Sequence, residues 1–312
     1  MSHYTVLVIG ENPEEMLEPY NEHTQVPEYI TSEVTDEKKM RFLEFYKDKE
    51  NTKNLKKGQS HKDIRVFIDE FPKYYQKYGN DWNGNRWRPD SNGVWQEYST
   101  YNPKSKWDWY ALGGRWKGML KLKAGAEGTQ GEPGAFGNSS PEGWVDQAYK
   151  GDIDWQGMRM IEKIKAIERY DKFEEETEKP PTADFVSQKY KWWEDDAYPN
   201  EKHPSSPKKD YDTFEDMLMK TWREKCASTT GIISIFHSGN IPSREEYVAK
   251  MQDFSTYAVL DEKGWHESGR MGWWGISHAS DEEQKKFQEG FFEKWIEPLD
   301  DDVLISVYDC HI

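Results

Sequence analysis

The stretch Tyr4-Thr5-Val6-Leu7-Val8-Ile9 decides the fold, and Val303-Leu304-Ile305-Ser306-Val307-Tyr308 repeats its character near the other end of the sequence. Each run has the length of a strand and is almost continuously apolar, a pattern typical of strands buried on both faces of a sheet. Two such strands belong at the centre of one sheet. We expect them to be antiparallel neighbours there, an arrangement compatible with ferredoxin-like folds.

The intervening sequence predicts both helices and further strands. Helices are indicated by apolar residues at helical spacing and by capping boxes, in which Glu follows Ser by three residues. They are expected over 64–78, over about 156–176, from Asp212 or Thr213 onward, from Ser243 onward, and from Ser280 to Pro298. Strands are expected at 232–237 and 257–260, with a hairpin over 107–122 that turns at Gly113 and Gly114.

The order of these elements favours one α+β domain over residues 1–312, with a mostly antiparallel sheet and helices packed on it. Loops or insertions are expected at about 124–142, which is rich in Gly, Ser and Pro, and at 198–209, which contains three prolines. Aromatic residues make up 15% of the chain, which excludes an intrinsically disordered protein. The core is therefore expected to consist of few, large side chains.

The sequence carries an excess of negative charge. Asp and Glu number 58 against 42 Lys and Arg, so the formal charge is −16 with neutral histidines. This balance argues against a broad nucleic-acid-binding face, which needs clustered basic residues. Acidic residues concentrate at 194–216 and at 281–302, a run that ends in Asp300, Asp301 and Asp302. Such runs are either solvated surface that maintains solubility or a face that docks on a basic protein surface.

Familiar enzyme and cofactor motifs are missing from the sequence. It contains no P-loop, dinucleotide fingerprint, nucleophile elbow, HExxH or Cys-x-x-Cys pattern, and Cys226 and Cys310 are its only cysteines. No apolar run approaches the ~20 residues that span a bilayer, and no secretion signal opens the sequence. We expect a cytoplasmic protein without a membrane partner, and the sequence leaves any metal or cofactor open.

Histidines stand at the outer ends of the two terminal strands. His3 begins the first run, and Asp309 and His311 follow the second. Because side chains alternate along a strand, antiparallel pairing in a suitable register brings both imidazoles and the carboxylate to one face. Such a set can bind a transition metal or act as an acid–base pair, with His237 as a further candidate member. The alternative is that these histidines are only polar residues at strand ends.

The densest unusual segment runs from Trp107 to Trp116. Its rings flank Asp108 and Arg115, an arrangement that can form a pocket in which a base stacks and Arg115 holds phosphate. Alternatively, tryptophan is the preferred core filler of this protein, and Asp108 pairs with Arg115 across the hairpin. The candidates for substrate or partner binding are therefore Asp108, Trp109, Arg115, Trp116, Asp300, Asp301 and Asp302.

Several blocks of the sequence resemble an uncharacterised protein family of bacteriophages and bacterial mobile elements. They are SHYTVLVIG (2–10), STYNPKSKWDWYALGGRW (99–116), GDIDWQGMR (151–159), MGWWG (271–275) and DCHI (309–312). Because the blocks are spread over nearly the whole chain, the resemblance covers a single unit rather than a borrowed domain. It implies a phage origin but carries no activity and no catalytic residue. Small acidic phage accessory proteins are often inhibitors of host defence, which is an argument by analogy.

These observations lead to two main hypotheses. The first is a phage-encoded acidic accessory protein, in the cytoplasm of a bacterial host, that binds and inhibits a host protein. A nucleic-acid-handling immune complex is the expected kind of partner, as for an anti-CRISPR inhibitor, without direct contact with nucleic acid. The second is a hydrolase or nuclease, with or without a metal ion, whose catalytic residues are His3, Asp309 and His311. A virion or morphogenesis protein is a third class.

Overall fold

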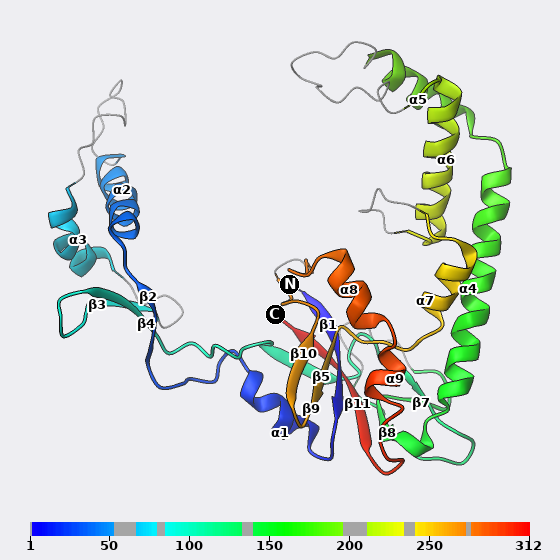
Figure 1. Ribbon diagram of the computed structural model, residues 1–312, viewed down its shortest axis with the longest axis horizontal. Helices are drawn as coiled ribbons and strands as arrows, with labels where there is room; N and C mark the ends of the chain where they lie inside the picture. The colour runs from blue at the N-terminus through cyan, green and yellow to red at the C-terminus, as the bar shows by residue number, and fades with distance from the viewer. Residues whose placement is uncertain are drawn as a thin grey trace.

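A computed structural model describes residues 2–52, 67–79, 85–132, 140–195, 211–233, 241–272 and 276–312. Within these residues, the centre of the molecule is a six-stranded sheet with the order β10-β9-β1-β11-β5, in which β8 also pairs with β11 (Figure 1). Its strands are β1 (His3–Ile9), β5 (Trp109–Leu112), β8 (Gln147–Tyr149), β9 (Ala258–Asp261), β10 (Gly264–Glu267) and β11 (Leu304–His311).

Helices flank this sheet and form two further parts of the molecule. The α-helices are α1 (Pro13–Leu17), α2 (Asp36–Thr52), α3 (Phe71–Tyr78), α4 (Trp155–Glu178), α5 (Ala183–Asp195), α6 (Phe214–Thr230), α7 (Arg244–Met251), α8 (Asp281–Gln288) and α9 (Phe291–Trp295). The smaller sheets contain β2 (Tyr29–Glu33), β3 (Arg86–Pro89), β4 (Trp95–Ser99), β6 (Leu120–Lys121) and β7 (Trp144–Val145). The predicted α+β class is confirmed.

The two strands nearest the chain ends lie side by side in the middle of the central sheet. β1 and β11 are antiparallel, with His3 opposite His311. Beyond them, Ser2 and Ile312 exchange two backbone hydrogen bonds of 3.2 and 3.0 Å. Most residues of both strands are buried, as expected from their continuous apolar runs. The predicted central, antiparallel pair is confirmed, and β9 runs parallel to β1 on its other side.

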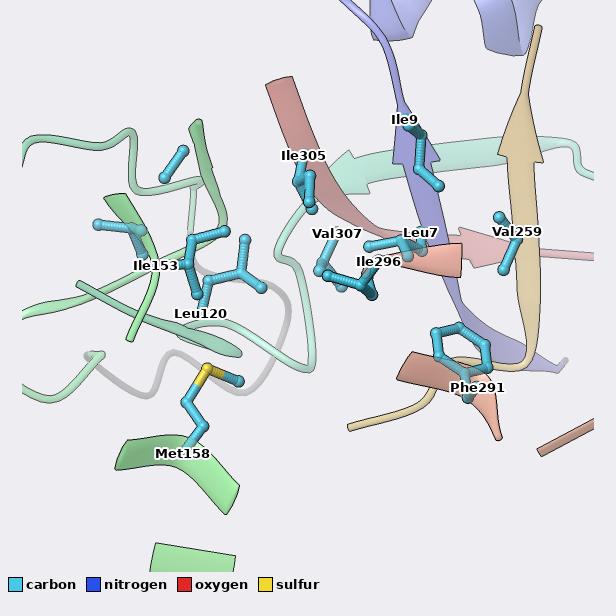
Figure 2. Close-up of a cluster of buried hydrophobic side chains, with 12 residues drawn as sticks. Leu7, Ile9, Leu120, Ile153, Met158, Val259, Phe291, Ile296, Ile305 and Val307 are labelled. Carbon is cyan, nitrogen blue, oxygen red and sulfur yellow. The ribbon is translucent and has the colours of Figure 1, made fainter. Parts of the chain in front are cut away.

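Each face of this sheet has its own apolar core. On the face shown in Figure 2, one apolar cluster contains Leu7, Val307 and Phe291 of α9, and it extends to Met158 near the start of α4, which lies beside Leu120 and Ile153. On the opposite face, Tyr4, Val6 and Val8 of β1 pack with Tyr308 and Cys310 of β11 and with the end of α1. This alternation fixes the side of the sheet to which each residue of β1 and β11 points.

Two further apolar cores lie away from the central sheet. The helices α4 to α7 surround Tyr170, Phe173 and Trp222, whereas α2 and α3 pack with β2, β3 and β4 around Leu43 and Phe71. Figure 1 draws these two parts on either side of the central sheet. Those predicted site residues that the structure describes lie on the central sheet and in the segments next to its strands, outside these two parts.

The sequence signals for helix starts are confirmed. The Thr213 side chain caps α6, and Ser243 and Ser280 form capping boxes at the starts of α7 and α8. The single helix predicted from Ser280 to Pro298 is wrong. Gly290 adopts a left-handed conformation with φ of 63°, which divides this segment into α8 and α9.

The predicted hairpin at 107–122 is also wrong. β5 pairs with β11, and β6 pairs with β7. Gly113 and Gly114 do turn the chain, with φ values of 70° and 53°. The local turn signal was therefore correct, but strand partners depend on contacts that are distant in sequence.

The remaining predictions concern shorter segments. The strand predicted at 257–260 corresponds to β9, and residues 232–233 of the one predicted at 232–237 follow α6 without forming a strand. Residues 234–237, 64–66 and the predicted loop 198–209 lie outside the described residues. In the described part of 124–142, the only regular pairing is a single bridge between Thr129 and Gln147. None of the described helices is long and apolar enough to cross a membrane.

Burial of hydroxyl and thiol groups in the central sheet predicts a loss of stability at alkaline pH. Burial raises the pKa of Tyr4 and Tyr308, and it raises the pKa of the Cys310 thiol well above its usual value. The folded protein therefore keeps protons that the unfolded chain releases above about pH 9, so the free energy of unfolding falls as the pH rises further. Urea unfolding at several pH values should show this fall. Tyr308→Phe should make it shallower, and an unchanged slope would contradict the assignment.

Candidate functional site

A row of three rings crosses the sheet at the chain ends. His3 of β1 lies opposite His311 of β11, which in turn lies opposite Trp109 of β5. The two imidazole centroids are 4.8 Å apart in an edge-to-face arrangement, and the indole centroid of Trp109 is 6.1 Å from that of His3. The antiparallel register of β1 and β11 therefore brings together two histidines that are separated by almost the whole sequence.

Each imidazole is held by a different carboxylate. Nδ1 of His3 lies 2.8 Å from Oδ1 of Asp309, and Nδ1 of His311 lies 2.6 Å from Oδ1 of Asp108. An ionised carboxylate only accepts hydrogen bonds, so Nδ1 of each ring carries the hydrogen that is donated to it. No hydrogen bond to Nε2 of either ring is found among the described residues.

The two imidazoles are mostly buried but remain partly exposed to solvent. The side chains of His3 and His311 are 16% and 14% exposed, whereas that of Asp309 is 1% exposed. A carboxylate that is fixed behind a ring keeps the ring oriented and stabilises its positive charge when it is protonated. The arrangement therefore offers two Nε2 atoms that can accept or donate a proton at the surface of the sheet.

Asp309 also fixes the turn that follows β5. Its second oxygen, Oδ2, accepts a 2.9 Å hydrogen bond from the backbone N–H of Arg115. A Cβ placed on Gly114 would lie 2.4 Å from Cβ of Asp309, and one on Gly113 would lie 2.4 Å from the carboxyl carbon of Asp146. Glycine is required at both positions because the backbone conformation is left-handed and the carboxylates approach closely.

Asp146 is a structural carboxylate that the sequence did not reveal. It is fully buried, and its two oxygens accept the backbone N–H groups of Gly118 and Gly131. Together with Asp309, it fastens both ends of the segment from Arg115 to Gly118. A buried aspartate whose partners are backbone groups from distant segments has no local pattern by which it can be recognised.

The other predicted residues divide between the site and its surroundings. Asp108, predicted for substrate or partner binding, contacts His311 through Oδ1. Trp109 is 47% exposed beside the imidazoles. The side chain of Arg115 is exposed at the turn bound by Asp309, and Trp116 is half-buried, with no ring partner among the described residues. The substrate- or partner-binding roles predicted for these residues stay predictions, and the contact of Asp108 with His311 was not predicted.

The three aspartates at 300–302 lie far from the histidines. They form an exposed turn between α9 and β11, where Asp301 lies 3.5 Å from Lys150. This turn precedes Leu304 at the start of β11, and His311 lies at the other end of the strand. At a rise of ~3.3 Å per residue, the two ends of β11 are about 23 Å apart. The acidic turn at 300–302 and the row formed by His3, His311 and Trp109 are therefore separate surfaces.

The described residues contain no group of three or more His, Cys, Asp or Glu side chains that could hold a metal ion. His237 lies outside these residues, as do Trp273, Trp274 and Gly275 of the resembling block. Cys310 is completely buried on the face opposite the imidazoles, and burial raises the pKa of its thiol. The thiol is therefore not a nucleophile for this site.

Two other features of the structure are separate from the histidine row. His266 also contacts a carboxylate, Oδ1 of Asp261, but through Nε2 at 2.8 Å, and its ring packs 4.7 Å from that of Trp295. A cavity of about 350 Å³ lies near the start of α4, lined among others by Met119, Met158 and Phe254. Its lining includes none of the predicted site residues.

Comparison of the chain with models of known protein families, with curated proteins and with solved structures finds no match.

Proposed function

We propose that the protein is a hydrolase that works by general acid–base catalysis with His3 and His311. One observation supports this proposal above all others. Two imidazoles stand 4.8 Å apart, and each contacts its own carboxylate through Nδ1. A single His–Asp pair is common in structural roles, but two pairs with adjacent rings provide both a proton acceptor and a proton donor.

The chemical step requires one neutral and one protonated imidazole. The neutral ring accepts a proton from water at Nε2 while the water oxygen forms a bond to the electrophilic atom of the substrate. The bond from that atom to the leaving oxygen breaks, and the protonated ring donates its Nε2 proton to the leaving oxygen. Asp309 and Asp108 hold the Nδ1 hydrogens throughout and stabilise whichever ring is positively charged. Exchange of a proton with solvent restores the starting state.

Water is the nucleophile in this scheme. The thiol of Cys310 is buried on the other face of the sheet. The carboxylates of Asp108 and Asp309 are engaged with the imidazoles, which favours orienting roles for them. The catalytic set differs from the earlier hypothesis in one respect, because Asp108 joins His3, Asp309 and His311 as a positioning residue.

A direct assay tests this proposal. The purified protein should hydrolyse at least one class in a panel of carboxylic esters, phosphate monoesters and phosphate diesters. The rate should fall at both low and high pH, because one ring must be protonated and the other neutral. Absence of turnover across the panel, or a rate that His3 and His311 substitutions leave unchanged, would contradict it.

A second candidate function is the acidic inhibitor of a host protein. Its support is the formal charge of −16 together with the exposure of the turn at 300–302, where the side chain of Asp301 is 83% exposed. The resemblance to phage proteins and the cytoplasmic location in a bacterial host belong to this candidate. No direct contact with nucleic acid is proposed for it.

Charge reversal at the acidic turn tests the inhibitor. Replacing Asp300, Asp301 and Asp302 with lysine should weaken capture of a host protein from lysate and flatten the salt dependence of that capture. The expected change is large because the substitution alters the local charge by about six units. A partner that binds the variant and the original protein equally well would remove the acidic turn from this account.

A further inference from the structure

Trp109, the third ring of the row, is more exposed to solvent than the two imidazoles. Trp109 is 47% exposed, whereas the side chains of His3 and His311 are about one-sixth exposed. β11 lies between β1 and β5, yet the rings of Trp109 and His3 form an edge-to-face pair with centroids 6.1 Å apart. The indole therefore extends toward β1, and a half-exposed aromatic ring lies beside the imidazoles.

We propose that the substrate of this site is a small phosphate diester that carries a planar heteroaromatic ring of the nucleotide kind. The ring lies against Trp109, and the phosphorus lies beside Nε2 of His3 and His311. This proposal rests on the acid–base function proposed above and specifies its substrate class.

Two features of the site favour a substrate with a heteroaromatic ring. A base stacked on an aromatic side chain gains about 1–3 kcal/mol, and stacking covers the indole surface that is now exposed to water. In addition, Oδ2 of Asp108 has no hydrogen-bond partner among the described residues, although Oδ1 binds His311. Asp108 directly precedes Trp109 in the chain. Its Oδ2 accepts a hydrogen bond from an amino or imino N–H of the heteroaromatic ring.

The phosphate diester is favoured over a carboxylic ester by the donors at the site. Hydrolysis of a carboxylic ester needs hydrogen-bond donors for the oxyanion, and these are commonly backbone N–H groups. The N–H of Arg115 is a backbone donor near the site, and Asp309 already accepts its hydrogen bond. A phosphate diester carries one negative charge before the reaction, which matches the single imidazolium that acid–base catalysis requires.

The position of Arg115 also suits an anion. Its backbone N–H contacts the same carboxylate that holds His3, and its side chain is exposed. A guanidinium matches the geometry of a phosphate group. The formal charge of −16 limits the size of the substrate, because a long polyanion is repelled by the rest of the molecule. A dinucleotide or another short phosphate diester meets both conditions.

The step balances with water as the second reactant. One imidazole takes a proton from water, and the water oxygen bonds to phosphorus. The bond between phosphorus and one ester oxygen then breaks, and the imidazolium protonates that oxygen. The products are a phosphate monoester and an alcohol, with no change in oxidation state.

The experiment compares two substrates that differ only in their rings. The hydrolysis of a dinucleoside monophosphate and of its abasic counterpart is followed by phosphorus NMR for the original protein, Trp109→Ala and Trp109→Phe. Loss of 1–3 kcal/mol of stacking corresponds to a 5- to 150-fold fall in kcat/KM for the dinucleotide in Trp109→Ala, mainly through KM. The fall for the abasic compound should be at least fivefold smaller, and phenylalanine should restore most of the loss.

A matched control removes another exposed tryptophan. Trp192 on α5 is 41% exposed, and Trp192→Ala should leave both rates unchanged. Equal losses on both substrates in Trp109→Ala would overturn the stacking role. Hydrolysis of carboxylic esters without any hydrolysis of phosphate diesters would overturn the substrate class but keep the acid–base function. Absence of turnover on every ester would overturn both proposals.

Discussion

Replacing His311 with alanine is expected to lower kcat by about 10²- to 10⁴-fold, the range in which a positioned acid or base contributes to a reaction. The ring stands 4.8 Å from His3 and contacts Asp108 through Nδ1. Alanine removes the Nε2 atom that exchanges the proton but leaves the backbone ladder of β11 in place. Steady-state kinetics on the substrate class found in the panel measures the loss, and circular dichroism and urea unfolding check the fold.

A comparison with other histidine variants separates catalysis from stability. His266 also contacts an aspartate and lies on the same sheet, and His266→Ala should keep full activity. His3→Ala should lose activity to a similar extent as His311→Ala. The double variant should lose little more than either single variant, because residues that act as a unit are not additive. Full activity in folded His311→Ala would end the acid–base proposal.

The second large effect is expected from Gly114→Ala. The added Cβ would lie 2.4 Å from Cβ of the buried Asp309, at a residue whose φ of 53° already disfavours a side chain. The left-handed conformation and the overlap together are expected to reduce the free energy of unfolding by about 3–5 kcal/mol. Asp309 must also move, so the activity of any folded fraction should fall because His3 loses its partner.

Gly125→Ala is the matched control for this substitution. Gly125 has a similar left-handed conformation, with φ of 80°, but nothing lies within 4 Å of an added Cβ. Gly125→Ala should therefore lower the free energy of unfolding only through the unfavourable left-handed conformation, by about 1–2 kcal/mol. Urea unfolding of both variants measures the difference. Equal costs at the two positions would show that the approach of Asp309 to Gly114 does not constrain the turn.

Much of the central sheet could be predicted because its strands have strong local patterns. The apolar runs at 4–9 and 303–308 indicate burial on both faces, and two buried strands at the chain ends imply a central pair. The alternation of side chains then places His3 and His311 on the same face once the strands are antiparallel. The prediction that Asp309 joins them followed from the same alternation.

What could not be predicted depends on partners that are distant in sequence. The sequence pattern around 109–112 is equally typical of one half of a hairpin and of an edge strand. Only the fold shows that this segment pairs with β11. That pairing brings Asp108 to His311, which gave it a role that the sequence did not suggest. Asp146 was missed for the same reason, because Gly118 and Gly131 bind it through their backbones.

The hydrogen bonds between Ser2 and Ile312 bring the two ends of the described chain together beside the imidazoles. Any polypeptide joined next to Ser2 or Ile312, such as an affinity tag, therefore begins beside the two imidazoles and can obstruct them. Assays should use protein from which tags have been removed.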